Sequence, residues 1–512
     1  MGGNGEMKGF KRALLILAVI ALLLPSAALA VNDGYSTAYT YTYDYWEDVQ
    51  ESPDAYRVET VIDSITLGLD TLNGTRIRQP QSLFVQGNDL YVCDTGNNRI
   101  IQIHWDGKTY TTARVISAIQ GTDKNTFNQP SDVFVDEEGT IYVADTSNER
   151  IVVMDRDLQF IKEFIKPADA TFDQSLSFLP KRLVVDVAGR VYCLVTNVNK
   201  GLVKYEADGT FTGYIGANTV SVSMGEYIWR RFFMTKAQRA QTISFVPTEY
   251  ENCYIDPQGF IYVTNTVFSE YDLKSDSAKP IRRLNNLGND ILIKNDRFPP
   301  IGDLFWQEGG STYGPSKFAD ITVLDNDIYV AVDRTRGRLF GYDSQGVLLW
   351  AFGTKGNTDG AFARAVSVEH MGYNLIVLDQ LENSITVFTP TEYGNTIYQA
   401  SEAYTRGEYD QSADLWREVL KLNANYPLAF RGIGRAVLRQ NHFEEAMNYF
   451  KLAHDRENYG RAFKLYRKVW VENNILIIVL ILAVVLIVPL GLGRIKKMKW
   501  EVIVHERSKV HK

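Results

Sequence analysis

The stretch that decides the fold is LYVCDTGNNRIIQIH, residues 90–104, because a near copy, IYVADTSNERIVVMD, follows at residues 141–155. In both stretches Tyr-Val precedes Asp-Thr, and an Asn and an Arg follow in the same register. Two matching stretches in one chain indicate an internal repeat, in which each copy is one small structural unit.

Six copies of this unit align along the chain. Each copy reads as short strands joined by polar turns, and several turns end in Gly, which accepts the positive φ of a tight hairpin. Four short antiparallel strands per copy predict an all-β propeller of six blades, in which RVETVID (57–63) adds the outer strand of the last blade and closes the ring. The copies are residues 79–103, 129–154, 179–205, 250–265, 318–342 and 363–388.

The segments YVCDTGNNRI and YVADTSNERI resemble NHL repeats, and the resemblance extends over residues 57–390. It implies a six-bladed propeller and a loose kinship with gluconolactonase-type enzymes, which hold a divalent ion with Glu, Asn and Asp. The third and fourth copies lack the repeated Asp and Arg. Since fold does not determine function, the site has to be argued from its own residues.

The repeated Asp and Arg are predicted to be structural. In three copies an Arg follows an Asp after five residues, so the two side chains flank one turn and can form a charge-assisted clasp. Equivalent positions in different blades point apart, which argues against a shared catalytic site. The predicted hairpin clasps are Asp94–Arg99, Asp145–Arg150 and Asp333–Arg338.

A ligand site is expected at one mouth of the central channel, where residues from all blades meet. The residues that open the innermost strands are Ser82, Asp132, Arg182, Asn252, Asp320 and Ala365. They are predicted either to bind a small polar ligand or sugar, or to cap strands and hold channel water. Oxygens of Asp132, Asn252 and Asp320 offer an alternative, a Ca²⁺ site.

Neither a cofactor nor a catalytic set is expected from motifs. The sequence contains no GxSxG, HExxH, P-loop or GxGxxG context, and the propeller segment contains two histidines, His104 and His370, which read as exposed turn residues. Cys93, Cys193 and Cys253 form an odd, sparse set, which predicts buried free thiols rather than disulfides. No metal ligand set is therefore assigned.

Two insertions interrupt the repeat, at 217–250 and 294–317. The first contains an amphipathic pattern in which Trp229 and Phe233 alternate with Arg230 and Arg231, predicting a helix that acts as a lid or docking surface, or plugs the propeller. The second is a long Pro- and Gly-rich loop, a type that often carries function. The Tyr-rich segment 31–56 alternates like a strand, which suits covering the flank of the propeller or stacking on sugars.

The two ends of the chain predict a membrane protein. Residues 1–30 have the basic, apolar and small-residue regions of a signal peptide. Residues 475–493 form an almost uninterrupted apolar run that can cross a bilayer, and the basic tail 494–512 is expected in the cytoplasm. This arrangement is a single-pass type I membrane protein with the propeller outside the cytoplasm.

Charge excludes one class of partner. The chain has a net charge of −7, and because its two terminal segments (1–30 and 494–512) carry +2 and +5, residues 31–493 carry −14. An acidic ectodomain argues against binding nucleic acid. In residues 393–471, two segments align at a shift of 34 and resemble tetratricopeptide (TPR) repeats, which implies a helical stalk with a surface for a peptide or subunit.

These observations favour a membrane-anchored binding or scaffold protein that recruits a ligand or protein partner, for instance in an envelope or transport complex. The alternative is a metal-dependent lactonase or hydrolase that uses the channel oxygens. A third reading is a purely architectural module.

Overall fold

The structure is a computed structural model, which describes residues 40–46, 48–69, 75–217, 249–268, 272–273, 278–294, 299–304 and 312–510. The predicted signal peptide and the candidate docking residues Trp229, Arg230, Arg231 and Phe233 lie outside these ranges. The chain divides into two compact units, Met1–Asn395 and Thr396–Lys512, which are described separately.

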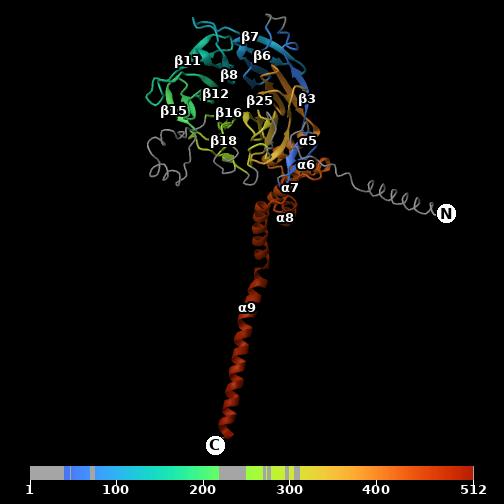
Figure 1. Ribbon diagram of the computed structural model, residues 1–512. Coiled ribbons are helices and arrows are strands. Elements are labelled where there is room, and N and C mark those ends of the chain that lie inside the picture. The colour runs from blue at the N-terminus through green and yellow to red at the C-terminus, as the bar shows by residue number, and fades with distance from the viewer. Residues whose placement is uncertain are drawn as a thin grey trace, which may run out of the picture. The chain divides into compact units, whose positions relative to one another are not determined.

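The first unit is the predicted six-bladed β-propeller, with β8, β12, β16 and β25 near its centre and β3, β7, β11 and β15 toward its periphery (Figure 1). Blade 1 contains β4 (Ser82–Gln86), β5 (Asp89–Asp94), β6 (Arg99–Trp105) and β7 (Tyr110–Ile116). Blade 2 contains β8 (Pro130–Val135), β9 (Ile141–Asp145), β10 (Arg150–Met154) and β11 (Phe160–Ile165). Blade 3 contains β12 (Pro180–Val185), β13 (Val191–Val195), β14 (Leu202–Tyr205) and β15 (Phe211–Ile215).

The remaining blades depart from this pattern. Blade 4 has three strands among the described residues, β16 (Asn252–Ile255), β17 (Ile261–Thr264) and β18 (Ile281–Leu284). Blade 5 contains β19 (Phe318–Val323), β20 (Tyr329–Asp333), β21 (Arg338–Tyr342) and β22 (Leu348–Phe352). Blade 6 contains β25 (Ala365–Met371), β26 (Asn374–Asp379) and β27 (Ser384–Pro390). A short parallel pair, β23 (Thr354–Lys355) and β24 (Ala361–Phe362), lies between blades 5 and 6 in the sequence.

The N-terminal part of the propeller joins its last two blades. β3 (Tyr56–Ile62) pairs antiparallel with β27 and completes blade 6, which confirms the predicted closure. β1 (Tyr41–Tyr43) pairs with β22, and β2 (Val49–Glu51) pairs with β1, so blade 5 has six strands. The Tyr-rich segment therefore covers the outer edge of a blade, where an unpaired strand would otherwise be exposed.

The hydrophobic core lies between the blades rather than in one central mass. Separate clusters join blades 1 and 2, 2 and 3, 3 and 4, 4 and 5, and 6 and 1, each built from both facing sheets. Blades 5 and 6 meet through Phe352 and Phe388, whose ring centroids are 5.2 Å apart. Cys93, Cys193 and Cys253 are buried in this core as free thiols, as predicted.

The second unit is helical. Its elements are α5 (Glu392–Arg406, which begins in the first unit), α6 (Tyr409–Leu422), α7 (Pro427–Arg439), α8 (Phe443–Leu452) and α9 (Arg456–Val510). The helices approach closely at two glycines: a Cβ at Gly434 would lie 2.7 Å from Phe450, and one at Gly432 would collide with Trp416. Gly407 and Asn441, which are 34 residues apart, end α5 and α7 with positive φ of 83° and 64°.

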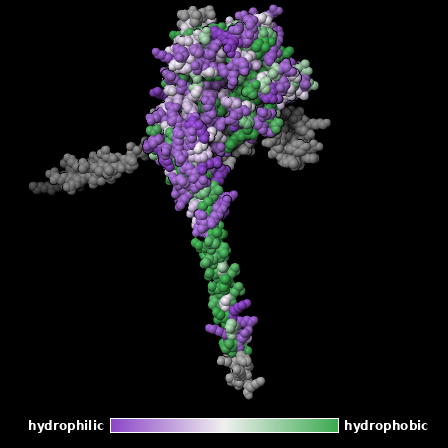
Figure 2. Space-filling model, turned by 180° about the vertical axis from the view of Figure 1, so that it is seen from behind, coloured by the Kyte–Doolittle hydropathy of each residue, from purple (hydrophilic) through white to green (hydrophobic). Residues whose placement is uncertain are grey.

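Helix α9 contains a run that is long and apolar enough to cross a membrane, with a mean hydropathy of 3.4 over 18 residues. Its surface is hydrophobic over a long stretch (Figure 2). The side chains of Ile477, Leu480 and Leu486 are more than half exposed there, so no protein core of the described chain accounts for their apolarity.

Candidate functional site

The repeated carboxylates of blades 1 and 2 belong to the scaffold. The Asp94 carboxylate lies 2.6 Å from Arg99 Nε, and the Asp145 carboxylate lies 2.9 Å from Arg150 Nε, with all four side chains buried. Asp94 also accepts a hydrogen bond from the backbone N–H of Arg78, and Asp145 accepts one from Asn128, at 2.7 Å each. Each Asp thus ties the second strand of its blade to the segment that enters the innermost strand.

The prediction for blade 5 needs a correction. Asp333 and Arg338 are opposite each other in the ladder of β20 and β21, but the ion pair of Arg338 is with Asp303 at 2.7 Å. Asp333 instead lies 3.5 Å from Arg336, and it accepts the N–H of Lys317 at 2.8 Å. Asp303 comes from the second insertion and is fixed by the hydroxyl groups of Tyr41 and Tyr43, a long-range contact that the spacing of the repeat could not reveal.

On one side of the channel, hydrogen bonds link the innermost strands of blades 1, 2 and 3. The Ser82 hydroxyl donates to Asp132, whose other oxygen accepts the backbone N–H of Leu183 at 2.8 Å. Arg182 donates to the carbonyl oxygens of Ser131 and Gln81 at 2.6 and 2.8 Å. Side chains of one blade therefore bind the free edge of the innermost strand in the next, which otherwise carries unpaired backbone groups.

On the opposite side of the channel, similar hydrogen bonds link the innermost strands of blades 4, 5 and 6. The Asn252 amide donates to Asp320, and the other oxygen of Asp320 accepts the Ser367 hydroxyl at 2.7 Å and the Val368 N–H at 2.9 Å. Ser367, not Ala365, is the counterpart of Asp320 in blade 6. The β-bulge between Ala365 and Ser367 also occurs at the start of β8, β12 and β19, so Ser367 occupies the position of Asp132, Arg182 and Asp320, and Ala365 lies two residues before it.

The predicted mouth residues are thus brought into one layer, called here the floor layer (Ser82, Asp132, Arg182, Asn252, Asp320 and Ser367), and are engaged there by protein groups. Burial raises the pKa of Asp132, and it raises the pKa of Asp320 to about 6, while Arg182 opposes both shifts. Since the carboxylates already accept several protein hydrogen bonds, the floor layer holds the blades together.

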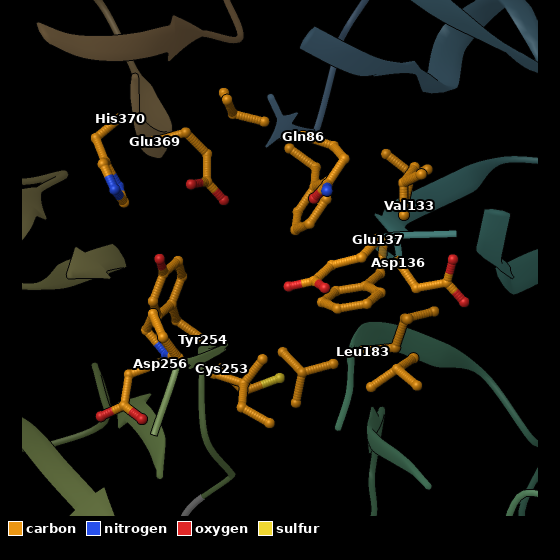
Figure 3. Close-up of a pocket in the computed structure, with 18 of the residues that line it drawn as sticks. Gln86, Val133, Asp136, Glu137, Leu183, Cys253, Tyr254, Asp256, Glu369 and His370 are labelled. Carbon is orange, nitrogen blue, oxygen red and sulfur yellow. The ribbon is translucent and has the colours of Figure 1, made fainter. Parts of the chain in front are cut away.

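Beyond the floor layer the channel opens into a cavity of about 730 Å³, within the usual range for small-molecule sites. The next layer along the innermost strands, called here the middle layer, consists of Phe84, Phe134, Val184, Tyr254, Thr322 and Glu369. Five of the six, all but Thr322, line the cavity, and Figure 3 shows Glu369, His370 and Tyr254 around an open centre.

Glu369 is the unusual member of the middle layer. It is 7% exposed, and its recorded side-chain partner is the hydroxyl of Thr322, which donates at 3.4 Å. Burial raises the pKa of Glu369 well above its usual range, and the nearby carboxylates of Asp320 and Asp132 raise it further. No Lys or Arg in the described parts of the chain forms an ion pair with it.

His370 differs from its predicted role as an exposed turn residue. It lies in β25, its Nδ1 is 2.8 Å from the Thr322 hydroxyl, and burial lowers its pKa. The imidazole is therefore neutral near pH 7 and does not act as a counter-ion for Glu369. His104, by contrast, is half exposed beside Asp89, as predicted, although it lies near the end of β6 rather than in a turn.

The turns that end the innermost strands form an acidic rim. Asp186 and Asp256 are neutralised by Arg190 at 2.7 Å and Arg283 at 2.8 Å. Glu137 has no recorded ion pair, and Figure 3 shows its side chain directed toward the centre of the cavity. Nine carboxylates line the cavity, whereas its described lining includes no Lys or Arg; they are Asp132, Asp136, Glu137, Glu138, Asp186, Asp256, Asp320, Asp325 and Glu369.

The acidic lining does not converge as a metal site does. Among the residues that the structure describes, no group of three or more His, Cys, Asp or Glu side chains could hold a metal ion. Asp132 and Asp320, offered by the sequence as ligands, instead accept hydrogen bonds in separate halves of the floor layer. The geometry thus gives the lactonase alternative no oxygen cage.

Comparison with known proteins agrees with the repeat and adds no function. A family model for the NHL repeat matches residues 127–154, in blade 2. No curated protein matches the chain. Solved structures with a similar fold include a virginiamycin B lyase from Staphylococcus aureus, at 10% identity and a TM-score of 0.35, covering 69% of this chain and 88% of that one.

Two further structures are similar at the same level. Kuenenia stuttgartiensis hydrazine synthase has 11% identity and a TM-score of 0.38, covering 62% of this chain and 99% of that one. A putative gluconolactonase has 9% identity and a TM-score of 0.36, covering 61% and 88%. The assignment of six blades rests on the strand pairing above.

Proposed function

We propose that this chain is a membrane-anchored binding protein whose propeller receives a ligand, or a segment of a protein partner, in its central channel. The observation that carries the proposal is the cavity of about 730 Å³ beyond the floor layer, because its middle layer and rim include carboxylates, Glu369 and Glu137, that form no ion pair within the described chain. The side chains of the floor layer and of the hairpin clasps, by contrast, already form hydrogen bonds or ion pairs within the propeller.

The proposal places the propeller outside the cytoplasm, with α9 as a single-pass type I anchor. The apolar run of α9 and the basic residues that follow it support this arrangement. The helices α5–α8 are proposed to be TPR-like repeats that offer a second surface for a protein partner. Gly407 and Asn441 support the repeat, since they occupy corresponding turns with the same left-handed backbone.

Binding is favoured over catalysis because of what surrounds the candidate groups. His370 is held by Thr322, and each floor carboxylate accepts protein hydrogen bonds, so no nucleophile and base face each other across the cavity in the described chain. A metal-dependent hydrolase would need oxygen ligands that converge on one point.

Photo-crosslinking tests the channel directly. Phe134→benzoylphenylalanine in the full chain, in its native membrane, should give an adduct on irradiation, because Phe134 lines the cavity. The matched control is Ile161→benzoylphenylalanine on the outer strand β11, where the side chain is 50% exposed. Adducts that are the same at both positions, or absent at Phe134, would contradict the proposal.

Orientation has a separate test. The three native cysteines are buried, so a cysteine introduced by Ile161→Cys should react with an impermeant maleimide in intact cells. One introduced by Lys509→Cys should react only after permeabilisation. The reverse result would place the propeller in the cytoplasm.

A further inference from the structure

The middle layer of the channel contains a buried carboxyl group that has no counter-ion within the described chain. Four of its six members are apolar or aromatic (Phe84, Phe134, Val184 and Tyr254), and one is the small hydroxyl residue Thr322. Glu369 alone carries a carboxylate, which points into the cavity in Figure 3. A buried carboxylate without a counter-ion is unfavourable, and a cationic ligand would relieve that cost.

Charged groups on the neighbouring strands do not supply that counter-ion. Arg182 on β12, the cation of the floor layer, donates to the carbonyl oxygens of Ser131 and Gln81 and opposes the pKa shifts of Asp132 and Asp320. Asp320 on β19 and Asp132 on β8 face Glu369 and are acidic, and both raise its pKa. His370, next to it on β25, is neutral near pH 7 because burial lowers its pKa. Tyr254 on β16 also faces Glu369, and burial raises the pKa of its phenol, so it stays uncharged. The position opposite Glu369 therefore suits a positive charge.

The wall beside this position is aromatic. The rings of Phe84 and Phe134 lie 4.8 Å apart, centroid to centroid, and both line the cavity. Aromatic faces attract ammonium and guanidinium groups and also contact alkyl chains. A metal ion, in contrast, would gain nothing from these rings and would find no cluster of ligands in the described chain.

The acidic rim at the entrance of the cavity also favours a positively charged ligand. A ligand that enters from the rim passes Glu137, whose side chain is directed toward the centre, and the exposed Glu138. These carboxylates carry no recorded ion pair, unlike Asp186 and Asp256 on the same rim. An acidic entrance raises the local concentration of cations and so accelerates their association.

We propose that the channel binds an organic cation, a primary ammonium or guanidinium on an aliphatic chain, with its charged head at Glu369 and its chain against Phe84 and Phe134. This inference rests on the proposed function and names its ligand class. The cation is either a free polyamine or a Lys or Arg side chain of a protein partner.

Binding should be linked to protons. Because burial and the neighbouring carboxylates raise the pKa of Glu369, this group holds its proton more tightly in the empty channel than an ordinary glutamate does. A bound cation favours the ionised form, so binding releases a proton and the affinity rises with pH.

Calorimetry on the full chain in detergent tests the ligand class with three probes: spermidine, a pentalysine peptide and CaCl₂. Spermidine or the peptide should bind, and CaCl₂ should not compete at equal ionic strength. Tight binding of spermidine alone indicates a free amine as ligand, and tight binding of the peptide indicates a protein side chain.

Glu369→Gln should weaken that binding roughly ten- to a hundredfold, since it removes one charge-assisted contact. Glu137→Gln, on the exposed rim, should fold normally and weaken binding roughly threefold. The control Glu59→Gln removes the same charge from the outer strand β3 and should leave the affinity unchanged.

Three results would overturn the inference: neither cation binds, Glu369→Gln binds as tightly as the unaltered chain, or CaCl₂ displaces the organic probes. None of these removes a crosslink formed through Phe134, so a failed ligand class is distinguishable from a failed channel site.

Discussion

Two kinds of buried carboxylate occur in this propeller, and they behave differently. Asp94 and Asp145 recur at the same place in their blades, and each is satisfied by an arginine and a backbone N–H. Glu369 occupies a position where other blades have Phe84, Phe134 or Tyr254, and it has no cationic partner among the described residues. A residue that the repeat requires is therefore architectural, and one that departs from the repeat inside the channel is a candidate for function.

The largest effect is expected where a repeated carboxylate is removed. Asp145→Ala removes the closer of the two carboxylates that pair with the buried Arg150 guanidinium and leaves only Glu163 at 3.3 Å, which should lower the free energy of unfolding by about 3 kcal/mol. The denaturation midpoint in urea measures this change. Asp157→Ala, an exposed carboxylate in the same blade, should change stability by no more than ~0.5 kcal/mol. If both substitutions lowered the free energy of unfolding equally, the repeated carboxylate would have no special structural role.

The free energy of unfolding should depend on pH because the carboxyl groups of the floor layer are buried. Burial raises the pKa of Asp320 from its ordinary value of 3.8 to about 6, so the folded state binds more protons than the unfolded state between about pH 4 and 6. Stability contributed by this group is thus present below pH 4 and is lost as the pH rises to 6, by roughly 3 kcal/mol.

Asp320→Asn should abolish that part of the slope, which thermal unfolding at several pH values measures. Because the Asp320 carboxylate also raises the pKa of Glu369, the difference between the two curves reports Asp320 together with its effect on Glu369. An unchanged slope in the variant would show that Asp320 is ionised in the folded protein throughout this range.

Blade 5 extends the comparison, because Arg338 forms its ion pair with Asp303 and not with Asp333. Tyr41→Phe deletes one hydroxyl that donates to Asp303 and should lower the free energy of unfolding by about 1–2 kcal/mol. Chemical denaturation measures this change. Tyr110→Phe, on the outer strand β7, serves as the control, and an equal loss there would mean that the effect does not report the contact with Asp303.

The smallest effect on stability is expected for Glu369→Gln. Because the carboxylate is buried without a cation, replacing it with an amide of the same size should leave stability within ~1 kcal/mol, on the stabilising side at pH 8. Thermal unfolding at pH 8 checks the sign. A large loss of stability would show that Glu369 is one more scaffold residue and would weaken its assignment to ligand binding.

Much of the fold could be predicted from sequence because repeats carry their own register. The copies gave the six blades, the closing strand β3 and the clasps of blades 1 and 2. The floor layer could be predicted in five of its six members, since each lies at or near the start of an innermost strand. Ala365 instead opens β25, as Pro130, Pro180 and Phe318 open β8, β12 and β19, so it lies two residues before the floor layer, where Ser367 is the true counterpart.

The middle layer was not predicted from the sequence, although one feature of the repeat indicates it. In SLFVQ, DVFVD and NCYID the third residue is aromatic, whereas in SVEHM it is Glu369, a charge inside a buried strand. Asp303 gave no comparable signal. Its partners Tyr41 and Arg338 are far away in sequence, and only the docking of β1 on blade 5 brings them together.

The sequence by itself determined the blades, the clasps and the apolar run of α9, because each depends on residues that are near one another in the chain or recur at a fixed spacing. Only the tertiary structure decided which carboxylates are satisfied and which remain free in the channel. The physical reason is that closing the ring brings residues of separate blades within hydrogen-bond distance, and no local pattern encodes those distances.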